Sequence, residues 1–295
     1  MRGVEILKPS ILSHKIYKVY GEESIAKLKE NPYGIVDDVY GIGFKTADII
    51  AEKLGQDKNG YNRCRAGIFY ILSSLAGEGH CYASFEDLIQ QGAKLLDIPE
   101  HIIAMTFDHL KNIICEDKSE IIYLPPFYHS EVGIAKRICE ITHTENKIIE
   151  DLDLERIIKS VQDKNRIIYD SIQISAIKTA VLSKFSIITG GPGTGKTTIT
   201  KVIIDIFKSM NKKVILAAPT GRAARRLTEM SKVEAKTIHR LLEADRSGNF
   251  SKNSENKLVG DVIIIDESSM LDTILMYNLL KAIPNEMAVI MIGDA

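Results

Sequence analysis

The amino-acid sequence predicts an α/β protein in which a parallel sheet with helices on its faces follows a mostly α-helical region. Two observations predict this fold class. From residue 165 onward, short apolar runs of strand length alternate with stretches of helix length, which is the rhythm of a parallel sheet. Before residue 150, amphipathic stretches are separated by Gly, Pro and Asn, and only one β-like run stands out. We therefore expect a helical first half and an α/β second half.

In the first half, apolar residues recur at helical spacing and turn residues mark the boundaries. The predicted helices are Ser10–Tyr20, Glu22–Lys29, Phe44–Leu54, Arg63–Leu75, Ser84–Leu96, Pro99–Cys115 and Ser130–Ile141. A β-like run over Ile121–Leu124 is ended by Pro125-Pro126. Helices followed by a short hairpin are typical of a winged-helix-like unit.

In the second half, each strand is a short apolar run and the next stretch has helical periodicity. The predicted strands are Phe185–Thr189, Val214–Ala218, Val262–Asp266 and Ala288–Ile292. The helices between them are Lys196–Ser209, Arg222–Met230 and Met270–Ala282. The polar, Ser- and Asn-rich stretch Arg246–Lys257 is predicted to form an exposed hairpin or loop.

Composition excludes two classes of protein. No apolar run approaches the roughly 18–20 residues of a membrane helix, and the N-terminus lacks the apolar stretch of a signal peptide. The cysteines are far apart and form no C-x-x-C pair, which argues against a sequence-local zinc site and a disulfide framework. We expect a cytoplasmic protein with no membrane partner.

Charge is unevenly distributed along the chain. The net charge of −1 divides into −5 for residues 1–150 (17 Lys and Arg, 22 Asp and Glu) and +4 for residues 151–295 (21 and 17). Between Lys196 and Arg240 there are 11 basic and 3 acidic side chains. This imbalance indicates either a polyanion partner or a solvated helix face.

A glycine-rich run directly follows the predicted strand Phe185–Thr189 and opens the next predicted helix. The run contains Gly190, Gly191, Pro192, Gly193, Thr194, Gly195, Lys196, Thr197 and Thr198, which is the G-x-x-x-x-G-K-T pattern of a P-loop in its strand-turn-helix context. Glycines let backbone N–H groups surround a phosphate, and the helix N-terminus adds positive potential. Lys196 would reach the β- and γ-phosphates and the Thr197 hydroxyl would ligate Mg²⁺.

Asp266 and Glu267 end another apolar strand, where they can face a metal across the carboxyl edge of the sheet. Asp266 would hold Mg²⁺ through water, and Glu267 would activate the water that attacks the γ-phosphate. The alternative is that the two carboxylates only cap the following helix. The adjacent acids favour hydrolysis over transfer to an acceptor, and the guanine-specific N-K-x-D motif has no clear counterpart.

Several further blocks resemble one family closely. They are Ala218-Pro219-Thr220-Gly221-Arg222, the run Thr237-Ile238-His239-Arg240-Leu241-Leu242, Ile292-Gly293-Asp294-Ala295, and Gln173 before the P-loop strand. With the two phosphate-site motifs they resemble the RecD-like DNA helicases of superfamily 1, in the stand-alone form with a long N-terminal extension. The resemblance implies a RecA-like ATPase domain that uses ATP and Mg²⁺, with Lys196, Asp266 and Glu267 catalytic. It also implies that Gln173 recognises adenine.

The resemblance assigns DNA contacts in both halves. Thr220 and Arg222, after a parallel strand, would contact the backbone of single-stranded DNA, although Thr220 could instead cap a helix. Arg225 and Arg226 are interpreted as a solvated basic face, with contact to a phosphate as the alternative. Near the N-terminus, Asn31-Pro32-Tyr33 and the run from Gly41 to Asp48 resemble the family's helix-hairpin-helix. Its Gly-x-Gly turn and helix start would bind a DNA phosphate through Gly41, Gly43, Lys45 and Thr46.

The hairpin assignment has an alternative. A plain helix–turn–helix packing motif could carry the same Gly-x-Gly turn, and the acids Asp37, Asp38 and Asp48 nearby disfavour an anion. The predicted domains are a helix-hairpin-helix region at 1–60, a mostly helical domain with winged-helix character at 61–150, and an ATPase domain at 151–295. The last of these is expected to be incomplete, so that the segment lacks the second lobe that the resemblance implies.

The predicted function is that of an ATP-dependent DNA helicase fragment. The resemblance implies 5′→3′ movement on single-stranded DNA, DNA junctions as partners, and a place in DNA repair and recombination. It leaves protein partners unknown. Two alternatives remain: a DNA-binding module whose P-loop lobe only senses nucleotide, and a P-loop ATPase of another kind, such as a clamp-loader-like remodeller.

Overall fold

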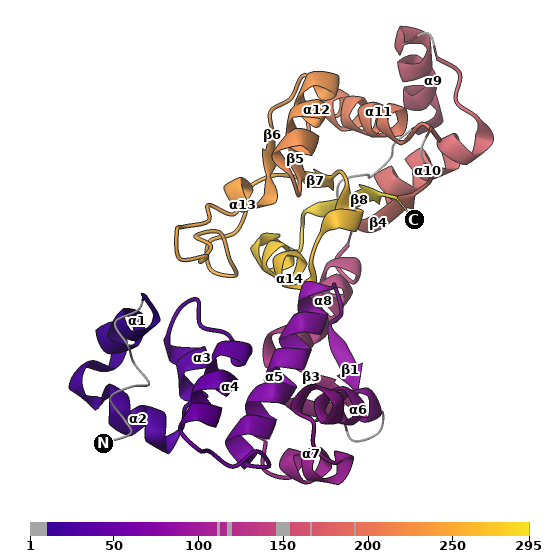
Figure 1. Cartoon of the computed structure of the whole chain (residues 1–295). Coiled ribbons are helices and arrows are strands. Elements are labelled where there is room, and N and C mark those ends of the chain that lie inside the picture. The colour runs from indigo at the N-terminus through magenta and orange to yellow at the C-terminus, as the bar shows by residue number, and fades with distance from the viewer. Residues whose placement is uncertain are drawn as a thin grey trace. The chain divides into compact units, whose positions relative to one another are not determined.

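The computed structural model describes residues 11–110, 113–116, 120–145, 154–165, 167–191 and 193–294 (Figure 1). Its contacts divide the chain into two units, Met1–Tyr128 and His129–Ala295. Each unit is built around hydrophobic residues of its own. The predicted division into three domains, at 1–60, 61–150 and 151–295, stays a prediction.

The first unit begins with short helices. They are α1 (Ile11–Tyr20), a 3₁₀ turn at Gly21–Glu23, α2 (Ser24–Glu30), α3 (Gly34–Asp38) and α4 (Phe44–Lys53). The longer helices α5 (Tyr61–Gly77), α6 (Phe85–Leu96) and α7 (Glu100–Phe107) follow. Apolar residues from all these helices form one core, and Ile16, Ala47, Ile68, Leu88 and Ile103 are fully buried. The predicted helical character of this region is confirmed.

A small antiparallel sheet completes the first unit. Strand β3 (Ile121–Tyr123) lies between β1 (Tyr82–Ser84) and β2 (Ile114–Glu116). The predicted helix Pro99–Cys115 is therefore wrong at residues 108–110 and 113–115, and residues 111–112 lie outside the described residues. Pairing of Cys115 with Ile122 across the sheet holds its end in a strand, an interaction between segments that local periodicity does not show. The order of helices and hairpin matches the expectation, and the winged-helix comparison stays a prediction.

A polar network joins α4 to α5 and α6. Arg63 of α5 donates from Nε to Asp48 Oδ1 (2.8 Å) and from a terminal nitrogen to Asp48 Oδ2 (3.0 Å), while the Tyr33 hydroxyl donates to Oδ1 (2.6 Å). Arg63 also donates to the carbonyl of Leu96, at the end of α6 (2.8 Å). Burial opposes ionisation of Asp48, but the hydrogen bonds from Arg63 and Tyr33 outweigh it and hold the pKa of Asp48 below its ordinary value. The Arg63 guanidinium therefore joins three helices, because it binds the Asp48 carboxylate of α4 and the Leu96 carbonyl of α6 from its place on α5.

Asp48→Asn is expected to lower the local stability of α4 and α5 by about 1–3 kcal/mol, because it removes the charge from a half-buried, doubly hydrogen-bonded pair. Hydrogen exchange followed by mass spectrometry on peptides from residues 44–77 measures the loss. Since the folded-state pKa of Asp48 is lowered, its stabilisation is present above pH 3.8 and disappears as the pH falls through the lowered pKa. The Asp48→Asn substitution should abolish that part of the acid sensitivity.

The matched control for this prediction is Asp37→Asn. Asp37 makes a longer contact to Arg65 (3.5 Å) and is mostly exposed, so its loss should change stability by less than about 0.5 kcal/mol. Equal protection in all three proteins would contradict a role for the Asp48 network.

The second unit holds a five-stranded parallel sheet in the order β4-β8-β7-β5-β6. The strands are β4 (Phe185–Thr189), β5 (Val214–Ala218), β6 (Ala235–Thr237), β7 (Val262–Ile265) and β8 (Ala288–Gly293). The four predicted strands are confirmed within one residue at each end, whereas β6 was not predicted. The predicted α/β class with a parallel sheet is therefore confirmed.

Helices cover both faces of this sheet. They are α8 (Pro125–Thr142), which enters this unit at His129, α9 (Leu154–Asn165), α10 (Ser171–Leu182), α11 (Lys196–Ser209), α12 (Gly221–Ser231), α13 (Ile238–Leu241) and α14 (Thr273–Ala282). Alternate residues of β7 point to opposite faces: Val262 and Ile264 pack with α9 to α12, and Ile263 and Ile265 pack with α8, α13 and α14. Figure 1 shows α11 and α12 on one side of the sheet and α14 on the other.

Local chemistry sets the helix boundaries. Asp272 caps α14 by accepting from the backbone N–H of Leu275 (2.8 Å), so the helix begins at Thr273 and the predicted start at Met270 is wrong. Ser268–Met270 forms a separate 3₁₀ turn. Helix α8 starts at Pro125 and not at Ser130, because proline is well suited to the first turn of a helix.

Among the described residues, every helix is too short or too polar to cross a bilayer.

Candidate nucleotide site and nucleic-acid surfaces

The glycine-rich run forms the predicted turn between β4 and α11. Gly193 and Gly195 have φ of +79° and +89°, a left-handed conformation that favours glycine, and Gly195 caps α11. A Cβ at Gly190 would lie 2.7 Å from Thr194 Oγ1, and one at Gly195 would lie 2.6 Å from Gln173 Nε2. The loop is thus compact, and glycine is required for its shape. Pro192 lies outside the described residues.

Lys196 is folded back onto this loop. Its Nζ donates to the carbonyl oxygens of Gly190 and Gly191, the latter at 2.8 Å. The same Nζ lies 2.7 Å from Oδ1 of Asp294, which follows strand β8. The lysine side chain is 19% exposed. Lys196, which is predicted to bind phosphate, therefore lies in the loop and has the Asp294 carboxylate as its counterion.

Gln173 lies beside the loop, as the sequence predicts, and both ends of its amide have partners. Nε2 donates to the Thr194 carbonyl (3.3 Å), and Oε1 accepts from the backbone N–H of Asp170 (3.3 Å). Asp170 in turn accepts from the Gln173 N–H (2.8 Å), which completes a capping box at the start of α10. Gln173 thus fastens α10 to the P-loop. Recognition of adenine by this side chain stays a prediction.

Asp266 and Glu267 follow β7 at the same sheet edge as the P-loop. Because β8 pairs in parallel with both β4 and β7, the carboxyl ends of these strands lie together. Burial raises the pKa of Asp266, the charge of Glu267 raises it further, and Arg226 and Lys196 lower it. Glu267 has φ of +53° and its Oε1 lies 4.0 Å from a guanidinium nitrogen of Arg226.

These residues fit the Mg²⁺ and nucleotide that the motifs imply. Asp266 is a half-buried carboxylate whose charged form a cation would stabilise, and Thr197 presents a hydroxyl at the first turn of α11. Within the described ranges, no group of three His, Cys, Asp or Glu side chains could hold a metal by itself. A few protein oxygens that share the ion with phosphates are characteristic of Mg²⁺ sites. Thr198, on the same turn, remains a predicted nucleotide contact.

The predicted single-strand contact residues follow β5 at this edge. The Thr220 hydroxyl accepts from the Ala223 N–H (3.3 Å), so the capping alternative is realised in this structure. Arg222 is exposed and lines a shallow hollow on α12 together with Arg225, Arg226 and Glu229. The hollow has a volume of about 610 Å³. It is a basic surface that can accept phosphates, and DNA contact by Thr220 and Arg222 stays a prediction.

The predicted hairpin of the first unit connects α3 to α4. Gly41 has φ of +81°, and Gly43 is the extended cap of α4. Ile42 is buried while Tyr40 is almost fully exposed, so the turn projects from the core. Lys15 of α1 was not predicted to lie here, yet its Nζ contacts the Tyr40 carbonyl (3.4 Å). Lys45 lies over the ring of Tyr70, with Nζ 6.0 Å from the centroid.

The three acids beside this hairpin have partners. Asp48 binds Arg63 and Tyr33, Asp38 accepts from the Tyr20 hydroxyl (2.6 Å), and Asp37 lies 3.5 Å from Arg65. Burial and the bond to Asp38 raise the pKa of Tyr20, which keeps it a donor. Two of the three acids thus lie beside an arginine, which weakens the objection that they would repel a phosphate, while Asp38 keeps its charge. Thr46 donates its backbone N–H to Gly43 and shapes the start of α4.

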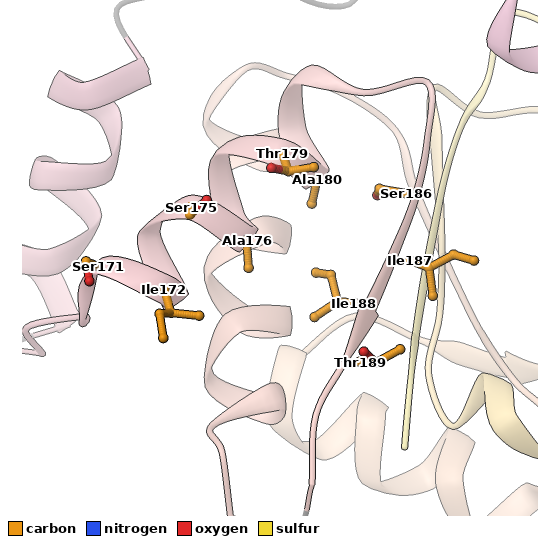
Figure 2. A pocket seen from close by; sticks show the side chains of 10 residues that line it. All are labelled: Ser171, Ile172, Ser175, Ala176, Thr179, Ala180, Ser186, Ile187, Ile188 and Thr189. Atoms are coloured by element: carbon orange, nitrogen blue, oxygen red, sulfur yellow. The ribbon is translucent and has the colours of Figure 1, made fainter. Parts of the chain in front are cut away.

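A separate pocket of about 470 Å³ lies between α10 and the edge strand β4. Figure 2 shows Ser186 and Ile188 pointing toward α10 and Ile187 pointing away from it. The Ser186 hydroxyl is buried without a partner among the described residues. Sequence reasoning singled out none of these side chains, because a pocket between a helix and a sheet edge leaves no local pattern.

Comparisons with known proteins agree with both halves of the chain. Residues 7–82 match a family model described as the HHH domain of the ATP-dependent RecD2 DNA helicase, and residues 173–295 match one described as an AAA domain. The ATP-dependent RecD2 DNA helicase of Deinococcus radiodurans is 30% identical in an alignment 299 residues long, gaps included. The alignment covers 96% of this chain and 41% of that protein.

Subunits of another enzyme match as well. The RecBCD enzyme subunit RecD of Buchnera aphidicola subsp. Schizaphis graminum is 35% identical over 59% of this chain and 32% of that subunit. The subunit from Haemophilus influenzae is 38% identical over 40% of this chain and 22% of that subunit. The chain thus spans about two fifths of the length of the first of these relatives and less of the others.

Proposed function

We propose that this chain, which belongs to the RecD-like helicase family, carries the ATP-hydrolysing lobe of a DNA helicase together with a DNA-binding N-terminal region. One observation carries the proposal. Lys196 of the P-loop and the Asp266-Glu267 pair lie at one edge of the parallel sheet, close enough that the charge of Lys196 opposes the rise that burial causes in the pKa of Asp266. A phosphate chain bound by the loop would therefore end close to both acids.

In the proposed site, loop N–H groups and Lys196 bind the phosphates of ATP, and Gln173 recognises the adenine. Thr197 and Asp266 would hold Mg²⁺, which supplies positive charge where negative charge develops on the transferred phosphoryl group. Glu267 would accept the proton of the attacking water. With these two acids in place, the site would transfer the γ-phosphate to water and not to a second substrate.

The proposed DNA partners are single strands and junctions. Thr220 and Arg222 would contact the strand backbone at the sheet edge, and the hairpin with Gly41, Gly43, Lys45 and Thr46 would bind a phosphate. The arginines that line the hollow on α12 support the first contact, and the projecting turn supports the second. Movement in the 5′→3′ direction is part of the proposal, and the predicted fragment status stays a prediction.

The deciding experiment measures ATP hydrolysis with single-stranded DNA, with double-stranded DNA and without DNA, in this chain and in the full-length product of its gene. The proposal expects stimulation by single strands in the full-length product. ATP binding without any turnover would favour the alternative, a DNA-binding module that only senses nucleotide. Turnover that no DNA changes would favour a P-loop ATPase of another kind.

Gly41→Ala is expected to weaken DNA binding about tenfold, because one hydrogen bond to a charged group contributes at least about 1.5 kcal/mol. A side chain at φ of +81° is strained, and its Cβ would lie 3.0 Å from Lys15 Nζ. Fluorescence anisotropy at low salt measures the affinity, which should show no sequence preference and should fall steeply as salt rises.

The control for this substitution is Gly55→Ala. Gly55 has a similar φ of +73° with open space around it, and it follows α4 at the end opposite to the hairpin. Its substitution imposes a comparable backbone strain without touching the turn. Equal losses in the two variants would show that strain, and not the hairpin, weakens binding.

A further inference from the structure

The ammonium of Lys196 has no hydrogen left for a phosphate. Three acceptors surround Nζ, namely the carbonyls of Gly190 and Gly191 and the carboxylate of Asp294. An ammonium group carries three N–H donors, so each acceptor takes one. A nucleotide that binds to the P-loop through Lys196 must therefore replace at least one of these partners.

Asp294 is the partner that a phosphate would replace. The two carbonyls are neutral and belong to the loop that surrounds the phosphate, whereas Asp294 carries a negative charge that repels an incoming phosphate. Its side chain is 58% exposed, so water can solvate the carboxylate once it leaves Nζ. A phosphate oxygen offers Lys196 the same charge-assisted bond that Asp294 gives up.

We propose that Asp294 is a positioning residue that holds Lys196 against the P-loop until the phosphates of a nucleoside di- or triphosphate displace it. The proposal rests on the proposed function, since it takes the P-loop to be the nucleotide site. Asp294 thereby lowers the affinity for nucleotide, because part of the binding free energy is used to break its ion pair with Lys196.

The position of Asp294 connects this exchange to the residues that follow the proposed base. Strand β8 lies between β4 and β7, and Gly293 at its end packs closely against the turn after Glu267. A Cβ at Gly293 would lie 2.9 Å from both Ser268 Oγ and the Ser269 backbone nitrogen. When Asp294 leaves Lys196, the change occurs one residue from this contact.

The test is a titration of the 295-residue chain with ATP and with ADP in the presence of Mg²⁺. Asp294→Asn should bind both nucleotides about threefold to fivefold more tightly, the range expected for the loss of a half-exposed ion pair. Asp294→Glu keeps the carboxylate and should restore much of the weaker affinity. Glu234→Gln is the charge control, since exposed Glu234 precedes β6 at the opposite edge of the sheet. Thermal unfolding checks that each variant is folded.

The same substitution in a Lys196→Ala background isolates the role of the lysine. There the gain from Asp294→Asn should be clearly smaller than in the natural background, because no ion pair remains to be broken and only the repulsion between the exposed carboxylate and the phosphates is relieved. An equal gain in both backgrounds would overturn the proposal in favour of direct repulsion between Asp294 and phosphate. Unchanged or weaker binding by Asp294→Asn in the natural background would overturn it as well. Absence of ATP binding by the unsubstituted chain would instead refute the proposed function, and this inference with it.

Discussion

Glu267→Gln is expected to slow ATP hydrolysis by ~10² or more, the usual scale of general-base catalysis, while ATP binding stays nearly unchanged. The carboxamide can still hold a water molecule by hydrogen bonding, but it cannot accept the proton. Glu267 is half-buried at the carboxyl edge of the sheet, and its nearest described cation is Arg226 at 4.0 Å. Single-turnover measurements on the full-length product of the gene separate the rate of hydrolysis from nucleotide affinity.

The matched control is Glu243→Gln. Glu243 has φ of +56°, the same left-handed conformation as Glu267, but it lies after α13, away from the phosphate loop. Glu243→Gln therefore makes the same carboxylate-to-amide substitution at the same backbone conformation, but away from the proposed site. The rate of ATP hydrolysis should not change. Unchanged turnover in Glu267→Gln would show that another group activates the water.

Lys196→Ala should weaken ATP binding about 100-fold or more, since it removes a charge-assisted hydrogen bond and the positive charge nearest the phosphates. The helix should persist, because alanine is a good helix former at the first turn of α11. Asp294 loses its partner in this variant, but its side chain is exposed and water can solvate the carboxylate. Isothermal titration with ATP and Mg²⁺ measures the loss of affinity.

Lys201→Ala provides the comparison for charge alone. Lys201 is exposed on the same helix and carries the same charge, so its loss should change ATP affinity by less than about twofold. Equal affinities in Lys196→Ala and the unsubstituted chain would refute the assignment of residues 190–197 as the nucleotide site.

Much of the second unit could be predicted because its signals are local. Strands β4 and β5 have the predicted bounds, and α11 begins at Lys196, where the glycine-rich turn ends. A run of buried residues such as Val262–Ile265 indicates a strand between two covered faces, and parallel strands place Asp266 at the edge that the P-loop occupies. Short β6 was missed, since three residues of intermediate and exposed burial carry little hydrophobic signal.

The first unit shows the limit of local signals. The predicted helix Pro99–Cys115 failed at residues 108–110 and 113–115, because the strand that follows depends on pairing with Ile121–Tyr123. Asp48 counted against anion binding in the sequence, whereas in the fold Arg63 and Tyr33 bind its carboxylate. Those partners come from 15 residues on either side, and helix packing alone brings them together.

The amino-acid sequence by itself was sufficient to predict a phosphate site, because a glycine-rich turn, Lys196 and an acidic pair after a strand are requirements on neighbouring residues. The tertiary structure alone decided which groups those residues contact. Asp294 reaches Lys196 from the end of another strand, and Arg226 reaches Glu267 from another helix. Such pairs depend on which strands lie side by side in the sheet, and strand order is set by the packing of the whole unit and not by any local pattern of residues.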